Sequence, residues 1–150
     1  MDDKRRRDSA VEDELDRLYE EGKLIEETKS FITAEKIYRF ADSNLGKRMA
    51  VASRNNKLYK ERKFVVGFPV KENAPDVVVQ GIIDAYFEEN GSIVLIDYKT
   101  DKVKEGQEDR LKERYRSQIE YYKKTLEKIT GMEVVQSYLY SFALNKEIEM

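Results

Sequence analysis

The sequence predicts a single α/β domain in which helices flank a mixed β-sheet, and three observations lead to this fold class. Apolar residues recur at helical spacing in the N-terminal part of the chain. From Leu58 onward the pattern changes to runs rich in aromatic and β-branched residues, two of which meet at Asn90-Gly91. A long helical segment, Asp109 to Thr130, then separates these strands from a last one, Val134 to Leu144.

Three helices are expected first. Arg6 to Glu21 carries apolar residues at helical spacing and is followed by Gly22, a residue type common just after helices. The other two helices expected are Thr33 to Phe40 and Ser43 or Asn44 to about Ala52, each opened by a residue that can cap a helix.

Three strands follow, and the long helix leads to a fourth. The first three are Leu58 to Val70, Asp76 to Glu88 and Ser92 to Thr100, with Pro69 and Pro75 bracketing the first loop. A crossover helix joins parallel strands, so the last strand should run parallel to Ser92 to Thr100. The expected order is α-α-α-β-β-β-α-β. We expect one domain, residues 1–150, made of a helical part, 1–44, and a core, 45–144.

Composition limits the chemistry that this domain can perform. Charged residues make up 39% of the chain, and the net charge is −2. No apolar run is long enough to cross a bilayer, and the N-terminus lacks the apolar segment of a secretion signal. Because cysteine and histidine are both absent, thiolate and imidazole ligands and histidine bases are excluded. We therefore expect a cytoplasmic protein whose chemistry uses Asp, Glu, Lys, Tyr or a bound ion.

Two aspartates and a lysine lie inside the apolar strands around the Asn90-Gly91 turn. A two-residue turn there pairs Glu89 with Ser92, and the same register places Asp84 opposite Asp97. Their Cβ atoms should then be about 4.5 to 5.5 Å apart, on the sheet face that also carries Lys99. Like charges placed opposite each other are destabilising, so this arrangement needs compensation.

Two explanations for this cluster remain open from the residues alone. Lys99 could be a structural counter-ion in an α/β domain without a site there, although partly buried ion pairs are seldom net stabilising. Alternatively, both carboxylates could ligate a divalent cation, and oxygen ligands favour Mg²⁺ or Mn²⁺. Such a cation beside a lysine suits phosphodiester hydrolysis, because both stabilise developing negative charge.

The residues "GIID", "DYK" and "QIEYY" together resemble the PD-(D/E)XK nuclease superfamily and, within it, the RecB-type nuclease domain. More narrowly, "VQGIIDAYFEENGSIVLIDYKTDKV" and "RYRSQIEYYKKTLEKITGMEVVQSYLYSF" resemble the C-terminal nuclease domain of AddA-type helicase-nuclease subunits. The resemblance covers about Leu45 to Phe142. It implies a restriction-endonuclease-like core, cleavage of DNA strands unwound during double-strand-break repair by recombination, and an AddB-type partner subunit in the full-length protein.

The resemblance also implies roles for individual residues. Asp84 and Asp97 would ligate the metal, Mg²⁺ or in its place Mn²⁺, together with the backbone carbonyl of Tyr98. Lys99 would be the catalytic lysine. Glu61 matches a glutamate that precedes the first core strand in AddA-like proteins, although a glutamate among lysines and arginines is more often only an ion-pair partner.

The long helix should border the nucleic-acid side of the site. Gln118 and Tyr122 match the family's Gln-x-x-x-Tyr motif, and with Tyr115 they form one stripe on the helix. Packing in the core is the alternative explanation for the two tyrosines. Arg114 and Arg116 flank the stripe and could hold phosphates of single-stranded DNA ends, while the tyrosines could stack on unpaired bases.

One departure from the family concerns a metal ligand. RecB-type domains have a histidine ligand on a helix upstream of the first core strand, whereas this sequence has no histidine. We therefore expect a fragment that begins just after that ligand and is a weak or inactive nuclease. It also has no phosphate-binding loop for ATP. The alternative function is a catalytically silent module of the same fold that binds DNA or a partner protein.

Overall fold

The computed structural model describes residues 34–150, and the predicted helix from Arg6 to Glu21 lies outside them. The described elements are α3 (Ala34–Asp42), α4 (Asn44–Arg54), β1 (Leu58–Phe68), β2 (Val77–Glu89), β3 (Ser92–Lys99), α5 (Glu108–Thr130), β4 (Val134–Ser141) and β5 (Lys146–Glu149). The predicted order is confirmed from the second helix to the last predicted strand, with boundaries that differ by a few residues.

The helix α4 begins where its capping residue predicts. Ser43 has an extended backbone, and its Oγ accepts a hydrogen bond from the N–H of Gly46 at 3.0 Å. Further along the chain, α5 is followed by Gly131, which has the left-handed φ of 71° that glycine adopts without strain. Local signals therefore set the start of α4 and the end of α5.

The five strands form one mixed sheet in the order β1-β2-β3-β4-β5. β3 and β4 pair in parallel, as the crossover helix predicted, and the other neighbours pair antiparallel. The fourth strand ends at Ser141 and not at Leu144 as predicted. The strand β5 was not predicted, because its four residues "KEIE" include only one buried side chain, Ile148, and so show no clear apolar pattern.

The turn between β2 and β3 has the geometry that its sequence predicts. Asn90 and Gly91 both have left-handed φ values, 54° and 78°, as a two-residue hairpin turn of type I′ requires. The turn closes on the pair Glu89 and Ser92, so the predicted register of the hairpin is confirmed.

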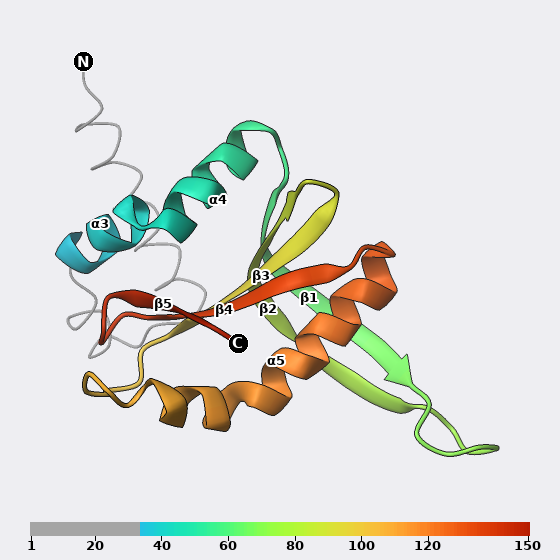
Figure 1. Cartoon of the computed structure of the whole chain (residues 1–150). Helices are drawn as coiled ribbons and strands as arrows, with labels where there is room; N and C mark the ends of the chain where they lie inside the picture. The colour runs from blue at the N-terminus through green and yellow to red at the C-terminus, as the bar shows by residue number, and fades with distance from the viewer. Residues whose placement is uncertain (1–33) are drawn as a thin grey trace.

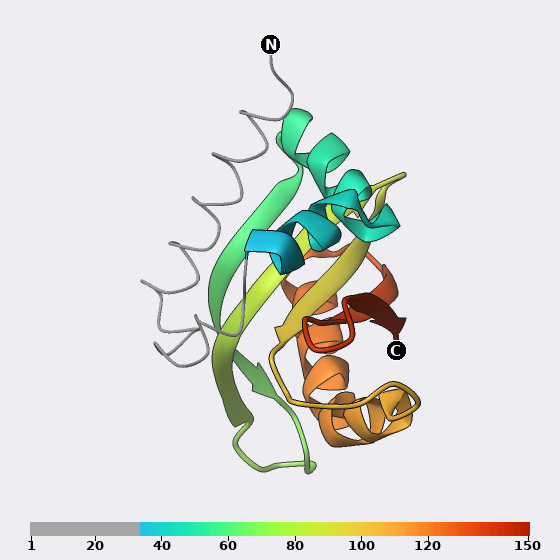
Figure 2. The ribbon, with the colours of Figure 1, turned by 90° about the vertical axis from the view of Figure 1, so that its left-hand side faces the viewer.

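Each face of the sheet packs against different helices. On one face, α3 and α4 cover a core that includes Phe87, Ile96 and Tyr140. On the other face, α5 covers a second core that includes Leu95 and Leu139. Figure 1 shows α5 crossing the sheet, and Figure 2 shows α3 and α4 on the side opposite most of α5. None of the helices within residues 34–150 is long and apolar enough to span a membrane.

Candidate active site

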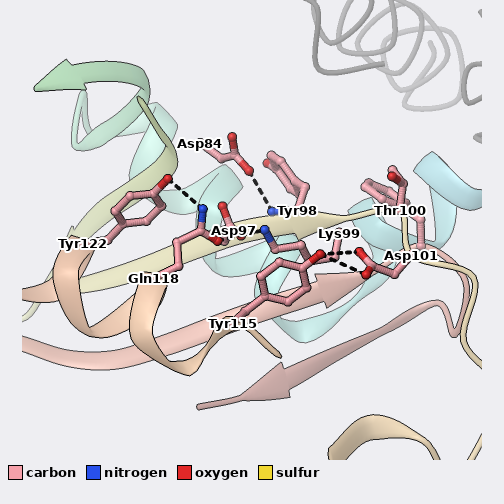
Figure 3. A pocket seen from close by; sticks show the side chains of 10 residues that line it. Asp84, Asp97, Tyr98, Lys99, Thr100, Asp101, Tyr115, Gln118 and Tyr122 are labelled. Carbon is pink, nitrogen blue, oxygen red and sulfur yellow. Dashed lines mark hydrogen bonds and ion pairs between the residues drawn. The ribbon is translucent and has the colours of Figure 1, made fainter. Parts of the chain in front are cut away.

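The two aspartates of the hairpin lie together beneath α5, as the register predicted. The ladder between β2 and β3 pairs Ala85 with Ile96, and one step further along the same register are Asp84 and Asp97. Their exposed fractions are only 5% and 4%, although both are acids. The backbone N–H of Tyr98 donates to Asp84 Oδ2 at 2.9 Å, which holds this carboxylate against β3 (Figure 3).

Lys99 is held between β3 and α5 by three interactions. Its Nζ lies 2.6 Å from Asp97 Oδ2 and donates to Gln118 Oε1 at 3.0 Å. The same ammonium lies 3.7 Å from the centroid of the Tyr115 ring, a cation–π distance. The side chain is 13% exposed, so this charge is fixed in position rather than free in solvent.

The predicted stripe of α5 faces this cluster. Gln118 Nε2 donates to the hydroxyl oxygen of Tyr122 at 3.0 Å. The Tyr115 hydroxyl lies 2.9 Å from both carboxylate oxygens of Asp101 and donates to that group. The amide of Gln118 therefore links Lys99 to Tyr122, so the stripe contacts the acidic cluster through polar atoms as well as by packing.

A cavity of about 270 Å³ opens over these groups. The lining residues are Asp84, Asp97, Tyr98, Lys99, Thr100, Asp101, Tyr115, Gln118, Tyr122 and Phe142. Three of these residues were not predicted from the sequence: Thr100, Asp101 and Phe142. The sequence did contain a sign of Asp101. It lies two residues after Lys99, as Lys99 lies two residues after Asp97, although β3 ends at Lys99.

Burial and charge shift the protonation of two lining groups. Burial, reinforced by the neighbouring charge of Asp84, raises the pKa of Asp97 to about 7, although Lys99 acts in the opposite direction. Burial and the hydrogen bond to Asp101 raise the pKa of Tyr115 to about 12, so its phenol stays protonated and donates. A proton can therefore compete with a cation for Asp97 near neutral pH.

Three other predicted residues lie away from the cavity lining. Arg114 pairs with Asp101 at 2.7 Å and is 67% exposed, so it lies beside the cavity without lining it. Arg116, 62% exposed, lies 3.9 Å from Glu113. Glu61 lies inside β1, between residues that pair with Ala85 and Ile83, and not before the first strand as the resemblance implied. Its φ of 50° is uncommon for a non-glycine residue in a strand.

Gly81 leaves little room for a side chain just before the acidic cluster. A Cβ at Gly81 would lie 3.0 Å from Cζ of the Phe64 ring and 3.7 Å from the Tyr122 ring. These two rings pack edge to face, with centroids 5.6 Å apart. The absence of a side chain at Gly81 therefore lets β1 and α5 meet beside Asp84.

The acidic pair fits a hard divalent cation. Two buried carboxylates face one another at a cavity, and oxygen atoms are the donors that Mg²⁺ prefers. Within residues 34–150, no cluster of three or more histidines, cysteines or acidic residues could bind a metal ion. A divalent cation here would be held by Asp84 and Asp97, because the third carboxylate of the lining, Asp101, is engaged by Tyr115 and Arg114.

Comparisons with known proteins agree with this arrangement. The sequence matches the PD-(D/E)XK nuclease superfamily over residues 1–148. Over 93% of its length it is 39% identical to the ATP-dependent helicase/nuclease A subunit of Clostridium beijerinckii and, equally, to that of Clostridium perfringens. The corresponding protein of Lachnoclostridium phytofermentans is 35% identical over 91% of this chain.

The match to these relatives is confined to a small part of each. The chain spans 12% of the length of the two Clostridium proteins and 13% of the Lachnoclostridium protein. The superfamily match, by contrast, covers nearly the whole chain and includes both aspartates and the lysine of the cavity. Because the fold, the grouping of these residues and the sequence match all agree, the chain belongs to the PD-(D/E)XK nuclease superfamily.

Proposed function

We propose that this domain hydrolyses phosphodiester bonds of DNA with the help of a divalent cation held by Asp84, Asp97 and the backbone carbonyl of Tyr98. One observation carries the proposal. Two buried carboxylates and an ordered ammonium group meet at a cavity in a member of a nuclease superfamily. PD-(D/E)XK nucleases generally use divalent metals, and we propose Mg²⁺ here, with Mn²⁺ able to replace it.

The residues of the cavity would have different roles in the reaction. When bound, the cation would polarise a phosphoryl oxygen and lower the pKa of a water molecule. Lys99 would offset the negative charge that develops on the phosphate, and Gln118 and Tyr115 would hold its ammonium in place for this. A charge that is already in position needs no reorganisation during the reaction. The fixed positions of these groups therefore support catalytic roles for Asp84, Asp97 and Lys99.

The relatives suggest the setting in which the domain acts. Their name, ATP-dependent helicase/nuclease A subunit, describes proteins that combine a helicase with a nuclease and belong to a larger assembly. We propose that this domain cleaves single-stranded DNA ends that a helicase has unwound, beside an AddB-type subunit, during repair of double-strand breaks in the cytoplasm. Residues 1–150 would form a single nuclease domain within that protein, and Arg114, Arg116 and Tyr122 would contact the DNA.

Cleavage of fluorescently labelled single-stranded DNA in Mg²⁺ or Mn²⁺ tests the proposal. We expect slow cleavage that EDTA abolishes and that Lys99→Gln reduces strongly, because glutamine cannot offset the phosphate charge. Isothermal titration with Mn²⁺ should detect binding in the wild type and in Lys99→Gln but not in Asp97→Asn. Cleavage that persists unchanged in Lys99→Gln would contradict the catalytic role of the lysine.

A catalytically silent DNA-binding module is the second candidate, and one observation favours it. Of the three aspartates that line the cavity, Asp101 is already engaged by Tyr115 and Arg114, which leaves Asp84 and Asp97 as side-chain ligands among the described residues. A longer chain with an added upstream segment that carries a histidine ligand of the family separates the two candidates. We expect it to cleave at least about 10-fold faster than this chain, since a missing ligand weakens and misorients the cation. DNA binding without cleavage in the longer chain would instead establish the silent module.

A further inference from the structure

A second cavity lies on the α5 side of the sheet, and none of its residues belongs to the site described above. Its volume is about 360 Å³, and it lies between β1, β2 and the C-terminal half of α5. We call it the β1–α5 groove and define it by Tyr59, Arg62, Lys63, Phe64, Tyr86 and Ile129.

The groove continues the face of α5 that borders the candidate active site. Tyr115, Gln118 and Tyr122 line the first cavity, and Leu126 and Ile129, one and two turns later, line the groove. Such spacing keeps residues on one face of a helix. Tyr122 of the first cavity and Phe64 of the groove are in direct contact, with ring centroids 5.6 Å apart. The two cavities are therefore neighbouring parts of one surface.

The separation between the cavities matches a few nucleotides. Gln118, which contacts Lys99, and Ile129 are eleven positions apart on α5, which corresponds to about 16 Å at about 1.5 Å per residue. Stacked nucleotides rise about 3.4 Å each, so a strand with one phosphate at Lys99 would reach the groove after about five nucleotides.

The groove offers the side chains that single-stranded nucleic acids bind. Tyr59 and Tyr86 stack at 4.8 Å with an interplanar angle of 19°, and the Arg62 guanidinium lies 5.4 Å from the Tyr59 centroid. Bases stack both on aromatic rings and on guanidinium planes. Arg62 and Lys63 are exposed, so both cations are accessible to phosphates. The nearby Glu88 accepts a hydrogen bond from the Tyr59 hydroxyl at 3.2 Å.

We propose that the β1–α5 groove is a second DNA subsite, which holds the bases and phosphates of a single strand about five nucleotides from the phosphate that is cleaved. The proposal rests on the proposed function, because it gives the groove the same strand that the active site would cleave. In this subsite Arg62 and Lys63 contact phosphates, while a base stacks on Tyr59, whose ring packs against the buried Tyr86. Affinity then depends on the length of the strand.

Binding of labelled oligo(dT) in EDTA tests the subsite without cleavage. Fluorescence anisotropy would compare strands of about 4 and about 12 nucleotides, because only the longer strand fills both cavities. For the longer strand we expect Arg62→Gln and Tyr59→Leu each to weaken binding about 5-fold or more, and Arg62→Gln to lower the salt slope by about 1. The shorter strand should bind these variants and the wild type equally.

Matched variants control for charge and for folding. Arg54→Gln removes an exposed cation at the end of α4, on the other side of the sheet, and should leave both affinities unchanged. Tyr59→Phe keeps the ring and removes only the hydroxyl, so it should bind like the wild type. Circular dichroism would verify that Tyr59→Leu is folded, and Arg62→Gln changes only a surface side chain.

The outcomes separate this inference from the proposed function. If the wild type cleaves DNA while Arg62→Gln and Tyr59→Leu retain full affinity for the longer strand, the groove is not a DNA subsite, and the active-site assignment stands. If the wild type binds and the variants lose affinity only for the longer strand, the subsite holds even where Lys99→Gln fails to alter cleavage. If the wild type binds neither strand, the subsite proposal falls, and the cleavage assay in Mg²⁺ decides the proposed function separately.

Discussion

The burial of the two aspartates predicts that the stability of the folded protein depends on pH. Burial and Asp84 raise the pKa of Asp97 from 3.8 to about 7 in the folded protein. The folded state therefore binds a proton more tightly than the unfolded state, so this group lowers stability as pH rises through the window from about 4 to 7. At about 1.4 kcal/mol per pH unit, raising the pH from about 5 to about 8 should remove at most about 3 kcal/mol.

This pH window is favourable for the measurement. The chain has no histidine and no cysteine, so the usual side chains that titrate there are absent. Thermal unfolding in EDTA should show a midpoint about 6 to 12 °C higher near pH 5 than near pH 8, if the whole effect is realised. The variant Asp97→Asn cannot ionise at this position and should lose most of that difference. Mg²⁺ should stabilise the wild type more near pH 8, where no proton competes for Asp97.

An equal pH dependence in the wild type and in Asp97→Asn would refute this reasoning. It would mean that Lys99, whose Nζ lies 2.6 Å from Asp97 Oδ2, fully compensates the buried charge. The two aspartates interact closely, so the proton belongs to the pair. The same measurement on Asp84→Asn should also reduce the pH dependence, because it removes the charge that opposes ionisation of Asp97.

Three further predictions follow from the packing around the site. Gly81→Ala places a methyl group 3.0 Å from a phenyl ring of β1 and should lower stability by about 1 to 3 kcal/mol in urea unfolding, whereas an unchanged midpoint would mean that the ring moves freely. Gln118→Leu removes a hydrogen-bond acceptor of Lys99 and should slow single-turnover DNA cleavage about 10-fold with little change in stability, and equal rates would contradict its positioning role. Arg48→Ala breaks the paired hydrogen bonds to Glu89, 2.8 and 3.0 Å long, and should cost about 1 to 2 kcal/mol of stability without slowing cleavage.

Elements with local signals could be predicted from the residues alone. Ser43 sets the start of α4, and Gly131 sets the end of α5, because both act on the backbone next to them. The Asn90-Gly91 turn defines the hairpin register, since two left-handed residues allow one pairing of the flanking strands. That register was enough to bring Asp84 and Asp97 to the same face.

Features that depend on contacts between distant segments emerged only from the folded chain. The sequence left open whether the stripe of α5 faces the aspartates or only the core. The stripe contacts the cluster because α5 crosses the sheet there and places Gln118 Oε1 3.0 Å from Lys99 Nζ. Asp101 follows the end of β3, and its contact with Tyr115 joins a loop to a helix. The charged residues of β5 do not show a strand pattern, because this strand forms through its pairing with β4. These features arise from long-range packing, which a local pattern of residues does not encode.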